Sequence, residues 1–158
     1  RVMAQKRGGK FKHDYSVDKL INLEHELGLD KAETFYKFDK KIRLVRGKLN
    51  KLVCKLKDQG KTIAGFGAPT KATTLMAHFG LDEKVLDFIV DDNPLKQGLY
   101  TPITHIPILS AEALYTLRPD YVMVLAWNFA EPIMKAHQMY SDNIGKFILP
   151  MPVPQIVE

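Results

Sequence analysis

Short apolar runs that alternate with helical segments after residue 61 constrain the fold of this chain more than any other feature. The runs are rich in Val, Ile, Leu and Phe, which is typical of strands that are buried on both faces of a parallel sheet. Their alternation with helices predicts an α/β fold, a Rossmann-like three-layer domain with a mostly parallel sheet. Strands are expected at residues 62–66, 85–90, 106–108, 120–126 and 146–149, and helices at residues 69–80, 110–117 and 130–140.

The first 60 residues have a different, basic and helical character. Ser16 is predicted to N-cap a helix over residues 17–27. Apolar residues then recur at three- and four-residue steps and predict one long helix over residues 31–59, which Gly60 ends. Its apolar stripe consists of Phe35, Phe38, Ile42, Val45, Leu49, Leu52 and Leu56. We therefore predict that residues 1–60 form the end of a strand and a helical connector, and that residues 61–158 form the Rossmann-like domain.

The charge distribution does not require a nucleic acid partner. Residues 1–60 hold 16 Lys and Arg against 8 Asp and Glu, whereas residues 61–158 hold 7 against 10. The basic residues share a predicted helix with interleaved acids, and no pattern of aromatic and basic residues suggests base stacking, so a solvated helix face explains them. No apolar run is long enough to span a membrane, so no membrane partner is expected.

The remaining composition favours a cytoplasmic location. No secretory signal is recognisable, and the single cysteine, Cys54, excludes an internal disulfide and is expected to be packed inside the long helix. The first residue is Arg rather than Met, so we expect the chain to be a fragment of a longer protein. The five histidines lack metal-ligand spacing, and no catalytic pair can be identified, so neither a metal site nor a catalytic residue is predicted.

The segment Gly65-Phe66-Gly67-Ala68-Pro69-Thr70-Lys71 lies between a predicted strand and a helix, where a dinucleotide-binding fold holds phosphate. Gly65 would allow the tight turn, Gly67 would let a phosphate approach the backbone, and the helix amides would favour the anion. Lys71 would meet the phosphate as a point charge. Thr70 stands where the fingerprint has its third glycine, so a tight turn beside a solvated lysine is the alternative.

Polar and aromatic residues follow the later strands at the same predicted edge. Asp91 ends the second strand, where Rossmann domains place an acid that binds ribose, although a turn before proline is the alternative. Lys96 in the following loop is either a ligand contact or a solvated lysine. Trp127 ends the fourth strand and would stack on a ligand or cover the core edge, whereas Phe129 is expected to cover the core.

Several motifs, in order, resemble the C-terminal domain of S-adenosylmethionine-dependent sugar C-methyltransferases. The resemblance covers about residues 61–156, and Arg1-Val2 also resembles the end of the strand that closes the methyltransferase domain in that family. Ile103 is a departure, because the family pattern usually has glycine there. The motifs are Gly67-Ala68-Pro69-Thr70-Lys71, Val90-Asp91-Asp92-Asn93-Pro94, Lys96-Gln97-Gly98 with Tyr100 and Pro102, His105-Ile106-Pro107-Ile108, Pro119-Asp120-Tyr121 and Ala126-Trp127-Asn128-Phe129.

The resemblance implies that this domain helps to hold a nucleotide-sugar. In the family, a zinc-binding N-terminal region and a methyltransferase domain precede it, and the parent enzyme methylates carbon on a keto sugar carried by a nucleoside diphosphate. The implied partners are the nucleotide-sugar and the preceding methyltransferase domain, and S-adenosylmethionine would be bound by a domain absent from this chain. The predicted substrate-binding residues are Gly65, Gly67, Ala68, Lys71, Asp91, Asn93, Lys96, Tyr100, Trp127 and Asn128.

Two alternative functions stay open. A stand-alone regulatory module that binds NAD or another nucleotide would keep the Gly65–Gly67 loop and Asp91 but use no sugar. A purely structural domain would have lost its ligand site. If the chain is instead the C-terminal domain of a C-methyltransferase, it should have no methyltransferase activity alone, because the methyl-donor loop and the catalytic base are expected in the domain that it lacks.

Overall fold

The computed structural model describes residues 3–12 and 14–157, and it confirms the α/β class with a mostly parallel sheet. In this part of the chain six strands form one sheet in the order β3-β2-β1-β4-β5-β6. All neighbouring strands are parallel except β5 and β6, which are antiparallel. The strands are β1 (Ile63–Phe66), β2 (Ile89–Val90), β3 (Ile108–Leu109), β4 (Tyr121–Val124), β5 (Lys146–Leu149) and β6 (Gln155–Val157).

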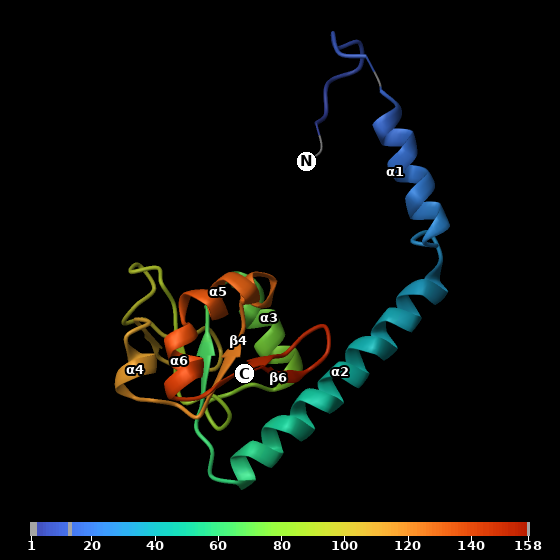
Figure 1. The fold of residues 1–158 in the computed structure, drawn as a ribbon. Coiled ribbons are helices and arrows are strands. Elements are labelled where there is room, and N and C mark those ends of the chain that lie inside the picture. Colours follow the sequence, from blue (N-terminus) through green and yellow to red (C-terminus); the bar gives the residue numbers. More distant parts are fainter. Residues whose placement is uncertain (1–2, 13, 158) are drawn as a thin grey trace. The chain divides into compact units, whose positions relative to one another are not determined.

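Helices cover both faces of the sheet, because successive side chains of each buried strand enter two separate cores. Met123 belongs to the core shared with α2 and α3, and its neighbour Val122 belongs to the core shared with α4, α5 and α6. Figure 1 shows α3 on one side of β4 and α6 on the other. The helices are α2 (Ala32–Asp58), α3 (Thr70–Phe79), α4 (Ala113–Thr116), α5 (Ala130–Ala136) and α6 (Gln138–Asn143).

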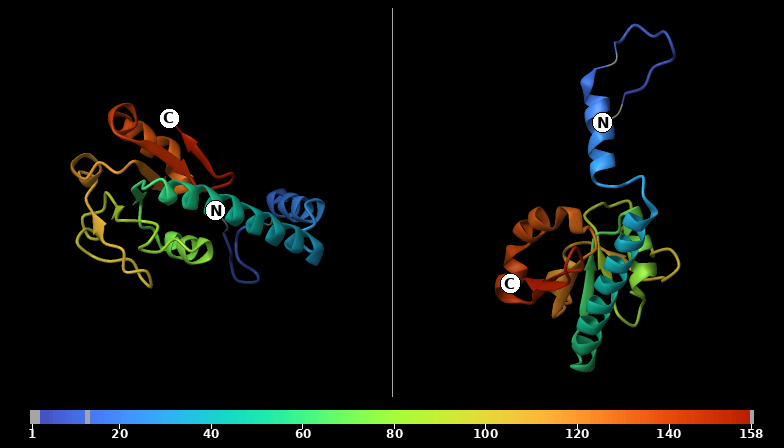
Figure 2. Two further views of the ribbon diagram at one scale, coloured as in Figure 1. Left: turned by 90° about the horizontal axis from the view of Figure 1, so that it is seen from below. Right: turned by 90° about the vertical axis from the view of Figure 1, so that its right-hand side faces the viewer.

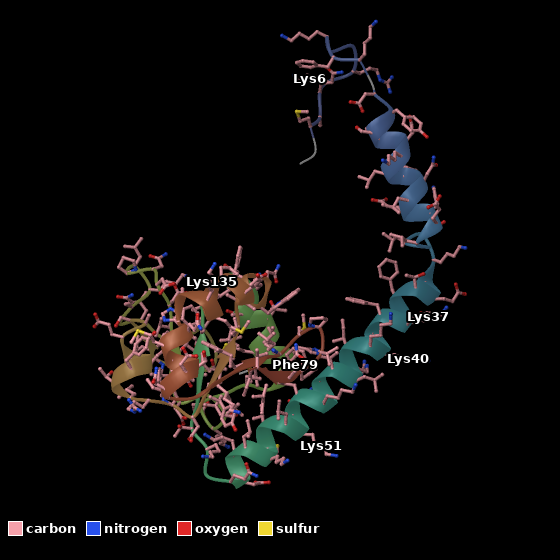
Figure 3. All side chains as sticks on the ribbon, viewed as in Figure 1. Lys6, Lys37, Lys40, Lys51, Phe79 and Lys135 are labelled. Carbon is pink, nitrogen blue, oxygen red and sulfur yellow. The ribbon has the colours of Figure 1, made fainter. Side chains whose placement is uncertain are left out.

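The second half of α2 is part of the domain core. The chain divides into two compact units, Arg1–Ile42 and Arg43–Glu158, so the larger unit includes the second half of α2. The cause is the apolar stripe: the side chains of Leu49 and Leu56 are at most 4% exposed and belong to the same core cluster as the buried side chains of α3. On the outer side of the same helix Lys51 projects into solvent, as Figure 3 shows.

The smaller unit has no apolar core among its described residues. Helix α1 (Tyr15–Glu26) buries none of its side chains, and its N-cap is Asp14, whose carboxylate accepts the Ser16 N–H at 2.8 Å. Ser16 was predicted to be the cap, but it lies inside the first turn. Phe35 and Phe38 at the start of α2 are more than half exposed, so the predicted stripe is buried only farther along the helix.

Some predicted elements fall outside this description or differ from it. Arg1-Val2, predicted to end a strand, lies outside the described residues, and residues 3–6 are not in a strand. Cys54 was expected to be packed, but it is exposed, because the neighbouring Val53 takes the buried position on α2. No helix in the described ranges is long and apolar enough to cross a membrane.

The late part of the chain contains a strand that was not predicted. β6 pairs antiparallel with β5, with Ile148 opposite Ile156, and lies at one border of the sheet (Figure 2). This strand was not predicted because the segment between β5 and β6 is rich in proline, which is unfavourable in strands. The helix predicted over residues 130–140 is divided at His137 into α5 and α6.

Candidate functional site

The carboxyl ends of three adjacent parallel strands bring most of the predicted site residues together. β2 and β4 flank β1, so the segments that follow these strands meet at one edge of the sheet. The Ala126 N–H after β4 donates to the Phe66 carbonyl of β1 at 3.2 Å, and the Gly67 N–H donates to the Val90 carbonyl of β2 at 2.7 Å. This is the edge at which open α/β sheets bind ligands.

The turn after β1 is made by Gly67 and not, as predicted, by Gly65. Gly65 lies inside the strand and makes no turn; a Cβ there would come within 2.9 Å of the Ile89 and Leu125 side chains. Gly67 makes the turn, with a φ of +88°. A Cβ on Gly67 would lie 2.7 Å from the Ala126 Cβ, so close contact with the chain after β4 also requires glycine here.

Lys71, in the first turn of α3, contacts two aromatic rings from the segment after β4. Its Nζ lies 5.5 Å from the ring centroids of both Trp127 and Phe129, within the range of cation–π attraction. Trp127 is half-buried and packs against the core cluster that includes α2 and α3, so it covers the core edge while its ring also faces Lys71. Phe129 was expected to cover the core, but it is 61% exposed, because the 3-10 turn η1 (Trp127–Phe129) directs it outward.

The first turn of α3 presents positive charge and contains no acidic residue. Pro69 is the N-cap residue and supplies no side-chain hydrogen bond to the first amides of the helix. Among the described residues, no ion pair involves Lys71. The dipole of a helix favours anions at this end, and an ammonium group in the first turn adds to that preference.

Asp91 is held by the chain itself and is only 7% exposed. Its Oδ2 accepts the Ala68 N–H at 2.7 Å and the Lys96 Nζ at 2.8 Å, and its Oδ1 accepts the Asn93 N–H at 2.9 Å. Burial raises the pKa of Asp91, but the hydrogen bonds from Lys96 and the two amides outweigh it, so the pKa lies below its ordinary value. Asp91 is therefore an ionised carboxylate at neutral pH. Gln97, which was not predicted, donates to the Asp91 carbonyl at 2.9 Å.

The other predicted residues are distributed between this edge and the border of the sheet. Asn93 accepts the Leu95 N–H in a turn, and Asn128 is exposed in η1. Tyr100 is apart from this group: it bridges Pro107, just before β3, on the outer side of the sheet. Ile103, in the same loop, has a φ of +70°, a conformation that glycine adopts at lower cost.

The edge is open rather than enclosed. The pocket beside the β1 loop has a volume of about 50 Å³, whereas ligand pockets typically hold several hundred. Its lining includes Ala68, Pro69 and Ala72 from the β1 loop and α3, and Thr101, Pro102 and Ile108 from the segment around β3. A nucleotide-sized ligand would therefore lie across the edge, with part of its surface uncovered by this chain.

A histidine–tyrosine pair on the opposite face of the sheet was not foreseen. The Tyr115 hydroxyl lies 3.0 Å from His137 Nδ1, and the imidazole packs on the Phe66 ring. Burial lowers the pKa of His137, and the Asp92 carboxylate offsets only part of that effect. Among residues 3–12 and 14–157, no three His, Cys, Asp or Glu side chains are grouped so that they could hold a metal ion.

Comparison with known proteins identifies one family. Residues 1–152 match the family described as C-methyltransferase C-terminal domain. The C-methyltransferase NovU of Streptomyces niveus is 36% identical over 142 residues, which are 90% of this chain and 34% of NovU. The chain thus spans about one third of the length of this curated relative.

Proposed function

This chain belongs to the family of C-methyltransferase C-terminal domains, and from that premise we propose that it binds the nucleotide-sugar substrate of an S-adenosylmethionine-dependent C-methyltransferase. The substrate is a keto sugar carried by a nucleoside diphosphate. S-adenosylmethionine binds to the part of the parent protein that precedes this domain. The domain anchors the diphosphate, and the methyl transfer takes place against groups that this chain does not supply.

The surroundings of Lys71 carry the proposal. A diphosphate has negative charge on both phosphoryl groups, and it needs donors and cations that are not already paired. Lys71 has no ion-pair partner among the described residues, and it projects from the first turn of an α3 helix that has no side-chain cap. Its ammonium is steadied by Trp127 and Phe129, whose rings also offer flat apolar surfaces to a sugar or a base.

The geometry at Asp91 favours a nucleotide-sugar over NAD. A Rossmann domain that binds NAD uses the acid at the end of the second strand to accept a ribose hydroxyl. Here that acid is buried and already accepts three donors, from Ala68, Asn93 and Lys96. Thr70 also replaces the third glycine of the dinucleotide fingerprint. An NAD-binding module is therefore the second candidate, supported by the β1 loop alone.

Titration calorimetry with four probes tests the proposal: UDP-glucose, dTDP-glucose, NAD and S-adenosylmethionine. The 158-residue chain is expected to bind at least one of the two nucleotide-sugars and neither of the other compounds. Selective binding of NAD would favour the regulatory module instead. If none of the four probes binds, the interpretation as a purely structural domain would be favoured. The chain should also fail to methylate any nucleotide-sugar alone; turnover would contradict the assignment of catalysis to the preceding domain.

A pair of lysine variants locates the site. Lys71→Met should weaken nucleotide-sugar binding by roughly 10- to 100-fold, because a hydrogen bond to a charged group contributes about 1.5–3 kcal/mol. Lys84→Met is the matched control, since Lys84 is an exposed lysine in the segment that precedes β2, toward the opposite edge of the sheet. Equal affinities of the two variants would place the anion somewhere other than α3.

A further inference from the structure

The Asp91 carboxylate joins three segments that the sequence separates. It accepts one hydrogen bond from the loop after β1, through the Ala68 N–H, and one from its own turn, through the Asn93 N–H. The third comes from the Lys96 ammonium in the next loop. Its main chain is also bound on both sides: the N–H donates to the Leu109 carbonyl at 3.1 Å, and the carbonyl accepts from Gln97.

This arrangement leaves little capacity for a ligand. A carboxylate offers about four lone-pair positions, of which three are used, and the side chain of Asp91 is only 10% exposed. A ribose hydroxyl could use only the one remaining position, on a side chain that is largely buried. Any further contact would displace an internal donor, and a buried donor left unpaired costs the full desolvation penalty of that group. The carboxylate is thus fixed by the protein, and it takes the place of an anion at the Ala68 amide.

The same contacts define what Lys96 can do. Its ammonium is 2.8 Å from Asp91 Oδ2, with a side chain that is 34% exposed. The pair is close to neutral as a unit, so it adds little attraction for a diphosphate. Lys71 has no such partner among the described residues, so of the two lysines it alone offers uncompensated charge to the edge.

We propose that Asp91 is a positioning residue: it fixes the Gly67–Ala68 turn and holds Lys96, and neither Asp91 nor Lys96 contacts the ligand. The Asp91 clamp, defined as Asp91 with Ala68, Asn93 and Lys96, keeps the β1 loop in one conformation before a ligand arrives. Only the statement about ligand contact rests on the proposed function, because the clamp itself is a property of the chain without a ligand.

Amide hydrogen exchange by NMR tests the clamp without any ligand. In Asp91→Ala the Ala68 amide should exchange about tenfold faster or more, because it loses a charge-assisted hydrogen bond. In Asp91→Asn a neutral side-chain oxygen can still accept it, so exchange should rise, but by less than in Asp91→Ala. Unchanged exchange of Ala68 in Asp91→Ala would overturn the proposal. If Asp91→Ala does not fold, faster Ala68 exchange in Asp91→Asn than in Lys96→Met is expected, and the reverse order contradicts the clamp.

Affinity for the nucleotide-sugar separates positioning from contact. Asp91→Ala should bind the nucleotide-sugar about tenfold more weakly than the unaltered chain. The affinity of Lys96→Met should stay within about threefold of the unaltered chain and should exceed that of Lys71→Met. Equal losses in the two lysine variants would make Lys96 a ligand contact and refute the proposal. If the unaltered chain binds no nucleotide-sugar, the proposed function fails, and the exchange of Ala68 still decides the clamp.

Asp120 provides a matched control at the opposite edge of the sheet. Its carboxylate also joins a main-chain amide and a lysine, accepting the Thr62 N–H at 2.9 Å and the Lys61 Nζ at 2.8 Å. Asp120→Ala should therefore lower stability without changing either the exchange of Ala68 or the affinity. A loss of affinity in Asp120→Ala equal to that in Asp91→Ala would show that both act only through general destabilisation, and it would overturn the positioning role.

Discussion

Replacing Gly67 by alanine should destabilise the domain by about 3 kcal/mol, through two separable effects. The first is conformational, because a φ of +88° places the residue in the left-handed region, which costs a non-glycine residue about 1–2 kcal/mol. The second is steric. The new Cβ would lie 2.7 Å from the Ala126 Cβ, well inside the usual carbon–carbon contact distance of about 3.5–4.0 Å, and relieving such overlap costs about 1–3 kcal/mol.

Gly80 separates the two effects. It ends α3 with a φ of +69°, and a Cβ there would meet no atom within 4 Å. Gly80→Ala should therefore show the conformational cost alone, about 1 kcal/mol. The steric part is isolated by adding Ala126→Gly to the Gly67→Ala variant. Removing the opposing methyl group should recover about 1–2 kcal/mol beyond what additivity predicts.

The free energy of unfolding, measured by circular dichroism in urea, gives these values for all four variants. Thermal unfolding provides a second measure, because each kcal/mol of lost stability lowers the melting temperature of a domain of this size by roughly 4 °C. Gly67→Ala should melt roughly 8 °C below Gly80→Ala. Equal losses in these two variants, or strict additivity with Ala126→Gly, would refute the close approach of the β1 loop to the segment after β4.

Three further changes test other parts of the structure. Ile103→Gly should stabilise the domain by about 0.5–1 kcal/mol in urea unfolding, because Ile103 has a positive φ and its 78% exposed side chain loses no packing; a loss of stability would contradict the left-handed turn. The hydrogen bond from Lys61 is the main cause that lowers the pKa of Asp120 to about 2. Ionised Asp120 therefore contributes about 1 kcal/mol to the free energy of unfolding, after allowance for its partial exposure. This contribution is complete above pH 4 and is lost as the pH falls toward 2. Asp120→Asn should flatten this part of a stability–pH profile. Leu49→Ala should cost about 3 kcal/mol, because Leu49 is fully buried, and Phe38→Ala less than 1 kcal/mol, because Phe38 is 60% exposed; similar costs would contradict the division of α2 between two units.

Sequence patterns predicted the sheet and most helices, because buried parallel strands are continuous apolar runs. The strand at Ile63–Phe66 and the helix at Thr70–Phe79 lie within one residue of the predicted bounds. The second strand was predicted over residues 85–90 but contains only Ile89–Val90. Residues 82–87 instead form a turn with main-chain hydrogen bonds to the Asp82 carbonyl, and the Asp87 carboxylate connects the segment to β1 by accepting the Ile63 N–H at 2.9 Å. Such long-range contacts leave no periodic signal in a sequence.

The meeting of several segments at one edge of the sheet was predictable, but the bonding among their side chains was not. Strand order brings the segments after β1, β2 and β4 to one edge, so the meeting of Lys71 and Trp127 follows from topology. A sequence does not reveal which of several acids and lysines pair with each other. Asp91 and Lys96 were therefore both predicted as ligand contacts, and their ion pair gives each a different expected role. The roles of all predicted site residues stay predictions until binding is measured.

The place of Trp127 has an optical consequence. It is the single tryptophan of the chain, and its indole lies beside the Lys71 ammonium at the core edge. Selective excitation of tryptophan would thus report on one fluorophore in a mixed polar and apolar setting. An anion that draws Lys71 away from the ring would change the local field and shift the emission. The unlabelled protein therefore contains its own reporter for events at the carboxyl edge of the sheet.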